Sequence, residues 1–159
     1  MKSSRPIVSR LMAAAFAAML SLTAAPLAVP MFSVSASAEE TVSPADTNAT
    51  QSVIDSQIGA FRSGDDASAY AFAAPSIKTI FPTPERFIAM VKSGYQALYD
   101  PESYSFGRNT FLYGEVYQEL IVTGRDGKLW QAVYTLKRQD DGSWKITGVK
   151  MNPYKGAST

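Results

Sequence analysis

The sequence contains no cysteine and no histidine. Without cysteine the chain can form no disulfide, no thiolate nucleophile and no cysteine-ligated metal site. Without histidine it lacks the commonest metal ligand and the commonest general acid and base, which excludes a histidine-based catalytic triad. The packed core must therefore supply the stability, and we expect neither a metal nor a cofactor.

Long apolar runs are also scarce, and the longest lies at the N-terminus. It covers residues 11–22, follows three basic side chains among the first ten residues, and precedes Ala-Ser-Ala at residues 36–38. A basic start, an apolar run and a small-x-small motif are typical of a signal peptide. The pattern predicts a signal peptide over residues 1–38, cleavage after Ala38, and a periplasmic or secreted bacterial protein.

An uncleaved membrane anchor is the competing interpretation, because apolar character continues to Val34. Pro26 and Pro30 interrupt this stretch and shorten any helix that could span a bilayer. No cysteine is present to carry a lipid at the cleavage site. We therefore expect no membrane attachment once the signal peptide is removed.

Basic residues do not outnumber acidic ones once the signal peptide is set aside. Residues 39–159 carry twelve basic and fourteen acidic side chains, a formal net charge of −2. Scattered lysines and arginines on a mildly acidic chain lack the basic surface of nucleic-acid binders, so no nucleic-acid partner is expected. The length of this segment suits one domain with a real core.

Patterning after residue 38 predicts a linker, three helices and a short tail. Residues 39–49 are polar and aperiodic, which favours a flexible linker. Apolar spacings of three and four predict one helix from Thr50 to Ser63, a second from residue 66 to residue 74, and a third from Pro84 to residue 99. We expect one domain over residues 50–152 and a loose tail over 153–159.

Two adjacent aspartates, Asp65 and Asp66, precede the second predicted helix. A paired-carboxylate active site needs both groups to converge on one substrate, whereas neighbouring side chains at a helix start usually point apart. An aspartate at this position accepts hydrogen bonds from free backbone amides. We therefore predict a structural cap made by Asp66, with Asp65 as the alternative capping residue.

The second half of the chain reads as antiparallel strands. Alternating and β-branched segments predict strands at residues 104–106, 111–123, 129–138 and 144–151, with a bend in the second at Gly114. Asp126-Gly127 is typical of a two-residue hairpin turn. Helices followed by a meander predict the α+β class: three N-terminal helices packed on a curved antiparallel sheet of about four strands.

The two turns set the expected strand register. A two-residue turn at Asp126-Gly127 pairs Glu119 with Tyr134, and a three-residue loop at the next turn pairs Leu136 with Ile146. The face toward the helices would then carry Tyr117, Glu119, Ile121, Trp130, Ala132, Tyr134, Leu136, Trp144 and Ile146. The outer face would carry Leu120, Val122, Val133, Thr135, Lys145 and Val149. Its apolar patch favours a homodimer through the outer face.

Three segments carry a resemblance to a known family. They read VIDSQIGAFRSGDDASAYAFAAPSIKTIF, FIAMVKSGYQALYDP and DGSWKITGVKM. They resemble the bacterial domain of unknown function 4864, which is similar to the wider nuclear transport factor 2-like group. The resemblance implies a cone of three helices wrapped in a curved sheet, often with a cavity. The smaller family has no established activity, so the resemblance assigns no catalytic residue.

The predicted register makes Glu119 and Tyr134 the polar end of a pocket, with Tyr95, Tyr99 and Trp130 as further ligand-binding candidates. The simpler alternatives are a glutamate at an open rim and aromatic rings that only fill the core. Two functions follow. The first is an exported, non-catalytic module that binds a small molecule or an envelope protein. The alternative is an isomerase- or dehydratase-like enzyme that uses the Glu119 carboxylate and a tyrosine.

Overall fold

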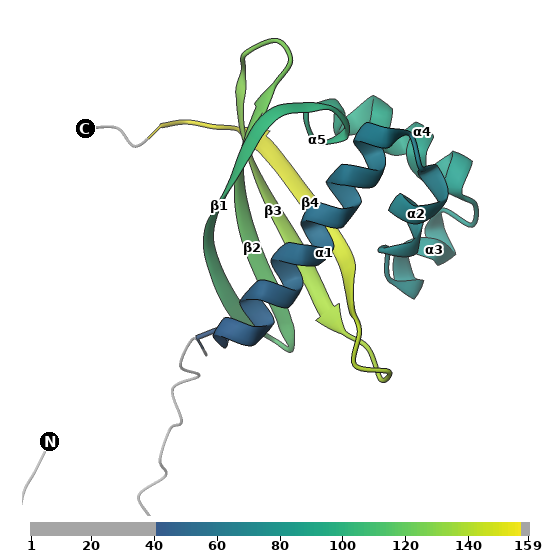
Figure 1. The fold of residues 1–159 in the computed structure, drawn as a ribbon, viewed down its shortest axis with the longest axis vertical. Helices are drawn as coiled ribbons and strands as arrows, with labels where there is room; N and C mark the ends of the chain where they lie inside the picture. The colour runs from purple at the N-terminus through teal and green to yellow at the C-terminus, as the bar shows by residue number, and fades with distance from the viewer. Residues whose placement is uncertain (1–40, 157–159) are drawn as a thin grey trace, which may run out of the picture. The chain divides into compact units, whose positions relative to one another are not determined.

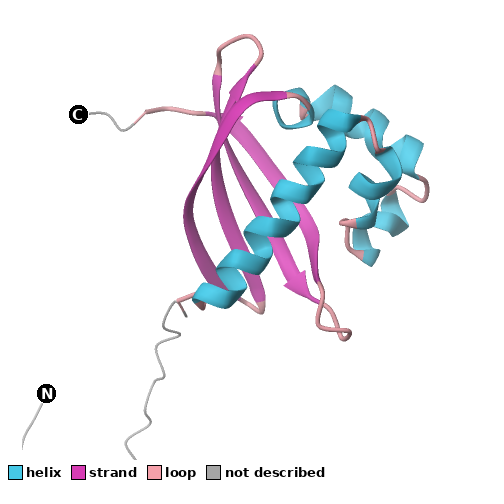
Figure 2. Cartoon of the chain, in the orientation of Figure 1, coloured by secondary structure: helices cyan, strands magenta, loops and turns pink. Residues whose placement is uncertain are grey.

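The computed structural model describes residues 41–156, so the predicted signal peptide lies outside the described residues. They form five helices and one antiparallel sheet with strand order β1-β2-β3-β4 (Figures 1 and 2). The elements are α1 (Pro44–Ser63), α2 (Asp66–Ala71), α3 (Pro75–Ile80), α4 (Pro84–Gly94), α5 (Gln96–Tyr99), β1 (Pro101–Leu112), β2 (Glu115–Gly124), β3 (Leu129–Arg138) and β4 (Trp144–Pro153). This confirms the α+β class with a curved four-stranded sheet, although five helices replace the predicted three. Within residues 41–156 no helix has the length and apolarity to cross a membrane.

Helix α1 begins at Pro44, six residues before the predicted start, and replaces most of the predicted linker. Ser43 is its N-cap: the Asp46 amide donates to Ser43 Oγ, which in turn donates to the Asp46 carboxylate. Pro44 fits the first helical turn because its missing N–H would have no helical partner there. The predicted linker is wrong because a proline among polar residues is typical both of a linker and of a first helical turn, and here it begins a helix.

Helix α1 lies diagonally across one face of the sheet, here called the inner face (Figure 1). Its Ile54 and Ile58 are fully buried against this face. We call the resulting cluster the sheet core; its buried members are Ile54, Ile58, Leu98, Val116, Leu120, Val122, Ala132, Tyr134, Leu136, Trp144 and Ile146. Burial of these apolar side chains is the main term that holds α1 on the sheet.

The capping role predicted for the aspartate pair is correct, but the capping residue is Asp65 and not Asp66. Asp65 Oδ1 accepts a hydrogen bond of 3.0 Å from the Ser68 amide, and α2 begins at Asp66. Hydrogen bonds from Ser68 lower the pKa of the Asp65 carboxyl. Of the two carboxylates, only that of Asp65 therefore has a defined local partner, which is the backbone of the helix that Asp65 caps.

The remaining helices differ from the prediction in two places. Pro75 does not only end a helix; it stands at the first turn of α3, which the sequence analysis missed. The third predicted helix is confirmed at its start, where Thr83 caps α4. It breaks at Tyr95, whose backbone leaves the helical region (φ −135°, ψ 38°), so that α5 follows as a separate turn.

A tight turn at Tyr113-Gly114 separates β1 from β2, so the single bent strand predicted over residues 111–123 is wrong. Both turn residues have positive φ, 52° for Tyr113 and 80° for Gly114, as in the turns that join two-residue hairpins. Leu112 pairs with Glu115 directly across this turn. Aspartate or asparagine usually precedes glycine in such turns. Because tyrosine stands at that position here, the sequence does not show the usual turn motif.

The predicted pairing of β2 with β3 is wrong by one residue. The Gly124 amide donates to Lys128 O and the Gly127 amide to Gly124 O, so the loop holds three residues, 125–127, with Gly127 left-handed. Tyr134 therefore pairs with Gln118, and Glu119 pairs with Val133. Because strand side chains alternate between faces, this slip turns every residue of β2 to the opposite face. The buried inner residues of β2 are Val116, Gln118, Leu120 and Val122.

The predicted pairing of Leu136 with Ile146 is confirmed, but a β-bulge follows it. Thr135 pairs with Gly148, which leaves Thr147 as an extra residue in β4. The bulge brings Val149 opposite the inward residue Tyr134. Leu120, Val122 and Val149 thus leave the predicted outer patch, and the argument for a homodimer through that face loses its basis.

Candidate functional site

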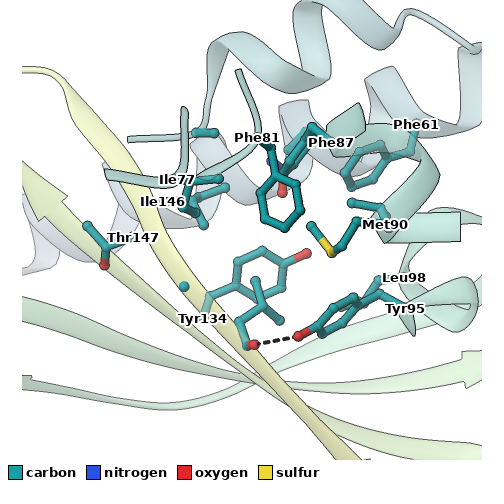
Figure 3. A pocket seen from close by; sticks show the side chains of 15 residues that line it. Phe61, Ile77, Phe81, Phe87, Met90, Tyr95, Leu98, Tyr134, Ile146 and Thr147 are labelled. Carbon is teal, nitrogen blue, oxygen red and sulfur yellow. Dashed lines mark hydrogen bonds between the residues drawn. The ribbon is translucent and has the colours of Figure 1, made fainter. Parts of the chain in front are cut away.

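A cavity of about 390 Å³ lies between the helices and the inner face of β3 and β4 (Figure 3). Its walls are mainly aromatic and aliphatic. Helices α1 and α4 contribute Phe61, Phe87, Met90 and Val91; the α3 region contributes Ile77 and Phe81; the sheet contributes Tyr134, Ile146 and Val149. None of the described residues that line the cavity carries a formal charge. Such a volume lies within the usual range for small-molecule sites, roughly 300–1,000 Å³.

Two features build the helical wall of the cavity. One is the periodicity of α4, and the other is a strand contact made by the segment that links α2 to α3. Phe87 and Val91 are four residues apart and therefore share the buried face of α4. Ile146 donates its amide hydrogen to Phe72 O, and the Ala74 amide donates to Ile146 O, so the link adds a short parallel bridge to the edge of β4. The bridge fixes the distance between α3 and the sheet and leaves room for the cavity.

Aromatic rings form a second hydrophobic cluster around this space. The Phe61 ring lies 6.4 Å from Phe87 and 5.6 Å from Tyr99, and Phe81 meets Phe87 edge-on at 6.4 Å. We call this the aromatic cluster; its buried members are Ala60, Phe61, Ala69, Ala73, Phe87, Ile88 and Val91. Phe61 and Phe87 of this cluster, together with Phe81, border the cavity on its helical side.

Tyr134 carries the polar group that matters most in this cavity. The residue is 1% exposed, and its hydroxyl points toward Met90 (Figure 3). Among the lining residues drawn in Figure 3, the one hydrogen bond runs from the Tyr95 hydroxyl to Val149 O, at 3.2 Å. Burial raises the pKa of Tyr134, so its hydroxyl keeps the proton under ordinary conditions. The cavity thus presents a neutral O–H whose neighbours in the wall do not use it.

Two other polar side chains border the cavity. Gln57 is buried and donates from Nε2 to Ala69 O at 3.2 Å, which ties α1 to α2. Thr147, the bulged residue of β4, has a buried Oγ1 without a partner in the described part of the chain. In Figure 3 it stands well apart from the Tyr134 hydroxyl. Polar groups in this cavity are therefore few and dispersed.

Glu119 does not lie in the cavity, because the one-residue slip places it on the outer face of the sheet. Its side chain is 18% exposed, and Gln131 Nε2 donates to it. Arg108 adds a weak contact of 3.4 Å from its amide and an ion pair of 3.7 Å from Nε. The predicted pair of Glu119 with Tyr134 therefore does not exist.

Gln118 is the inward polar residue that the sequence analysis missed. It is fully buried opposite Tyr134, and its Nε2 donates to the carbonyls of Gly107, Arg108 and Glu119 at 3.2, 3.4 and 2.9 Å. Its Oε1 accepts from Gln51 of α1 at 3.2 Å. These bonds satisfy the β1 bulge at residues 107–108, so Gln118 is structural. Val116, Leu120 and Val122 alternate along the strand in the same phase as Gln118, and this alternation is the sequence signal that could have placed Gln118 inside.

A family model described as "Domain of unknown function (DUF4864)" matches residues 43–159 of the chain. The chain belongs to this family. The match begins at the α1 cap and spans every described helix and strand, so the cavity lies wholly inside the family domain. No curated protein matches the chain, and no solved structure matches it.

Two of the five predicted site residues line the DUF4864 cavity, Tyr134 and Tyr95. Tyr99 packs behind the wall, with its ring on Phe61 and the Lys92 ammonium 4.9 Å from the ring centre. Trp130 borders a separate hollow of about 350 Å³, beside the ion pair of Asp100 with Arg125. The described residues bring together no three acidic side chains that could hold a metal ion.

Proposed function

We propose that this DUF4864 protein binds a small, uncharged apolar molecule in the cavity between its helices and β3–β4, without catalysing a reaction on it. The observation that carries the proposal is the 390 Å³ apolar cavity with the Tyr134 hydroxyl at its wall, which bonds to none of the lining residues drawn in Figure 3. Enclosing apolar surface supplies the binding free energy, and one polar group supplies orientation.

The enzymatic alternative has less support. Proton abstraction requires a base within hydrogen-bond reach of the substrate. Glu119 lies on the opposite face of the sheet, and the described lining holds no carboxylate. A tyrosine whose pKa is raised by burial donates a hydrogen bond well but is a poor base. Binding is therefore the simpler function for this geometry.

Helix α3 offers the route by which a ligand enters. None of its residues is buried, although Ile77 and the following Phe81 line the cavity. The Tyr70 hydroxyl donates to Phe81 O at 2.6 Å and holds the far end of α3 in place. A weakly packed segment tied at its ends opens at lower free energy than the sheet.

Naphthalene is a suitable probe of binding, because it has no polar atom and fits the cavity. A ligand that binds the native state raises the melting temperature. We expect naphthalene to stabilise the full chain and an Ile80→Phe control, since Ile80 is 71% exposed and outside the lining. Val91→Phe, which fills the cavity, should stay folded by circular dichroism and lose the shift. An equal shift in all three proteins, or none in the wild type, would contradict the proposal.

We further propose that the protein acts outside the cytoplasm, in the periplasm or after secretion, on a small molecule or an envelope protein. The basic start, the apolar run and the Ala-Ser-Ala motif at residues 36–38 support this. Mass spectrometry of protein from the native envelope should find an N-terminus at Glu39. A chain that retains Met1 in the cytoplasmic fraction would refute export.

We also infer a relationship to the nuclear transport factor 2-like group. A long first helix along the inner face of a curved antiparallel sheet, short helices beside it and an internal cavity support this inference. Superposition of an experimental structure on members of that group would test it. A different strand order from β1-β2-β3-β4 would contradict it.

A further inference from the structure

We propose that the ligand of this cavity carries an uncharged oxygen acceptor, such as a ketone, ester or ether oxygen, on a body of two or three rings, and that Tyr134 Oη donates to that oxygen. This inference rests on the proposed binding function and names the chemical class of the ligand. It depends on three features: the hydroxyl, the charges around the cavity and the cavity volume.

The hydroxyl lies at the cavity wall, where a bound molecule can reach it. Tyr134 stands in the middle of the sheet, between Gln118 of β2 and Val149 of β4, and is 1% exposed. Its Oη points into the cavity toward Met90, whose thioether sulfur is only a weak acceptor (Figure 3). Leaving a buried O–H without a partner is costly, so an acceptor on the ligand gains more here than in water.

The polar side chains nearest to Tyr134 already have partners, and Thr147 Oγ1, which has none in the described part of the chain, stands well apart from the Tyr134 hydroxyl (Figure 3). The Tyr95 hydroxyl donates to Val149 O, and the Gln57 amide donates to Ala69 O. Tyr134 retains its proton because burial disfavours the phenolate. An oxygen of the ligand is therefore the acceptor that complements the wall.

The charges near the cavity disfavour ionised ligands of either sign. Aromatic walls can hold a cation, but Lys78 and Lys92 already sit on the outer rings of the cluster, 5.0 Å from Tyr70 and 4.9 Å from Tyr99. Their positive charges oppose a cationic ligand. Neither ammonium group belongs to the cavity lining, so a carboxylate inside would lose its hydration without gaining a counter-ion.

The volume sets the size of the ring system. An apolar cavity of about 150 Å³ holds benzene. The cavity in this protein measures about 390 Å³, which suits two or three rings with a short substituent. The faces of Phe81 and Phe87 offer stacking or edge contacts to such rings.

The test is a matched pair of probes that differ in one atom group. Acetylnaphthalene carries a ketone, and isopropenylnaphthalene replaces its C=O by C=CH₂ at the same shape. We expect the full wild-type chain to bind the ketone about ten-fold more tightly by calorimetry. Naphthoate, the charged analogue, should not bind measurably at neutral pH.

Variants then locate the donor. Tyr134→Phe should bring the affinity ratio of ketone to alkene close to one, and should leave alkene binding unchanged. Tyr104→Phe removes a hydroxyl that is bonded to Asp55 at 2.8 Å, outside the cavity lining, and should keep the wild-type ratio. If Tyr134→Phe does not fold, the wild-type comparison of the two probes still decides.

The outcomes separate this inference from the proposed function. Equal affinity for ketone and alkene, with naphthalene still bound, would overturn the assignment of an oxygen acceptor and leave the binding function intact. A ratio that survives in Tyr134→Phe would overturn Tyr134 as the donor. Tight binding of naphthoate would overturn the exclusion of anions. If naphthalene itself fails to bind, the proposed function falls together with this inference.

Discussion

The sheet core and the aromatic cluster meet along α1, but they are filled in different ways. In the sheet core, branched aliphatic side chains from α1 and the strands interlock, and the buried Gln118 has all its strong groups bonded. In the aromatic cluster, rings surround a hollow, and the Tyr134 hydroxyl at its border is not bonded to the wall. The first arrangement stabilises the fold, and the second leaves room for a molecule. The difference predicts how substitutions on the two sides should behave.

The largest effect is expected from leucine truncation in the sheet core. Leu120→Ala opens a new void where Leu120 is fully buried, and should lower the free energy of unfolding by about 4 kcal/mol. Leu98 also belongs to the sheet core but lines the cavity, so Leu98→Ala enlarges a cavity that already exists and should cost about 2–3 kcal/mol. Urea denaturation of both variants measures the difference. Equal costs would mean that the cavity side is packed as tightly as the sheet core.

The next largest difference in stability is expected between substitutions of Gln118 and Tyr134, two inward polar residues that pair across β2 and β3. Gln118→Leu leaves the carbonyls of the β1 bulge without donors and should cost about 2–3 kcal/mol. Tyr134→Phe removes a hydroxyl that bonds to none of the lining residues drawn in Figure 3 and should change stability by less than about 0.5 kcal/mol. A large cost for Tyr134→Phe in chemical denaturation would show that the hydroxyl is bonded in the free protein.

A smaller effect is expected from adding one methylene group to a valine on each side. Val116→Ile overfills the sheet core and should destabilise the protein by about 1–2 kcal/mol. Val91→Ile extends into the cavity and should be neutral or stabilise by up to about 1 kcal/mol. Thermal melting of the two variants is sufficient. Destabilisation by Val91→Ile would indicate that the hollow closes in solution.

The smallest effect concerns the bond that holds α3. Tyr70→Phe removes the hydrogen bond to Phe81 O and should cost about 1 kcal/mol of stability. It should also speed both association and dissociation of naphthalene, because the wall at α3 opens more often, with little change in affinity. Stopped-flow kinetics would detect this, and unchanged rates would place the entrance elsewhere.

The sequence predicted the outline of the sheet core better than that of the aromatic cluster. Strand alternation and the glycine of the second loop gave the β3–β4 pairing at Leu136 and Ile146, because that turn left one pairing that kept like residues together, but they did not reveal the bulge at Thr147. The β2–β3 register failed, since Asp126-Gly127 suits both a two-residue turn and the observed three-residue loop. The one additional loop residue shifts the pairing by one position, which places Glu119 on the outer face of the sheet and Gln118 on the inner face.

Residue patterns could not reveal the cavity as such. Aromatic side chains at helical spacing look the same whether they fill a core or border a hollow, and tertiary packing alone decides between the two. Tyr134 and Tyr95 line the cavity, since both lie on apolar faces that turn inward. Tyr99 and Trp130 satisfied the same criterion and lie elsewhere, since α5 and the end of β3 place them behind or beside the wall.

Helix α1 contributes to both clusters along its twenty residues, with Ile54 and Ile58 in the sheet core and Ala60 and Phe61 in the aromatic cluster. The sheet core and the aromatic cluster therefore share one helix, and neither cluster can unfold completely without disturbing the other. Cooperativity of this kind spreads a local gain in stability over the whole domain. A molecule bound at the C-terminal half of α1 would then slow hydrogen–deuterium exchange in β1 and β2 as well, two strands that contribute no residue to the cavity lining.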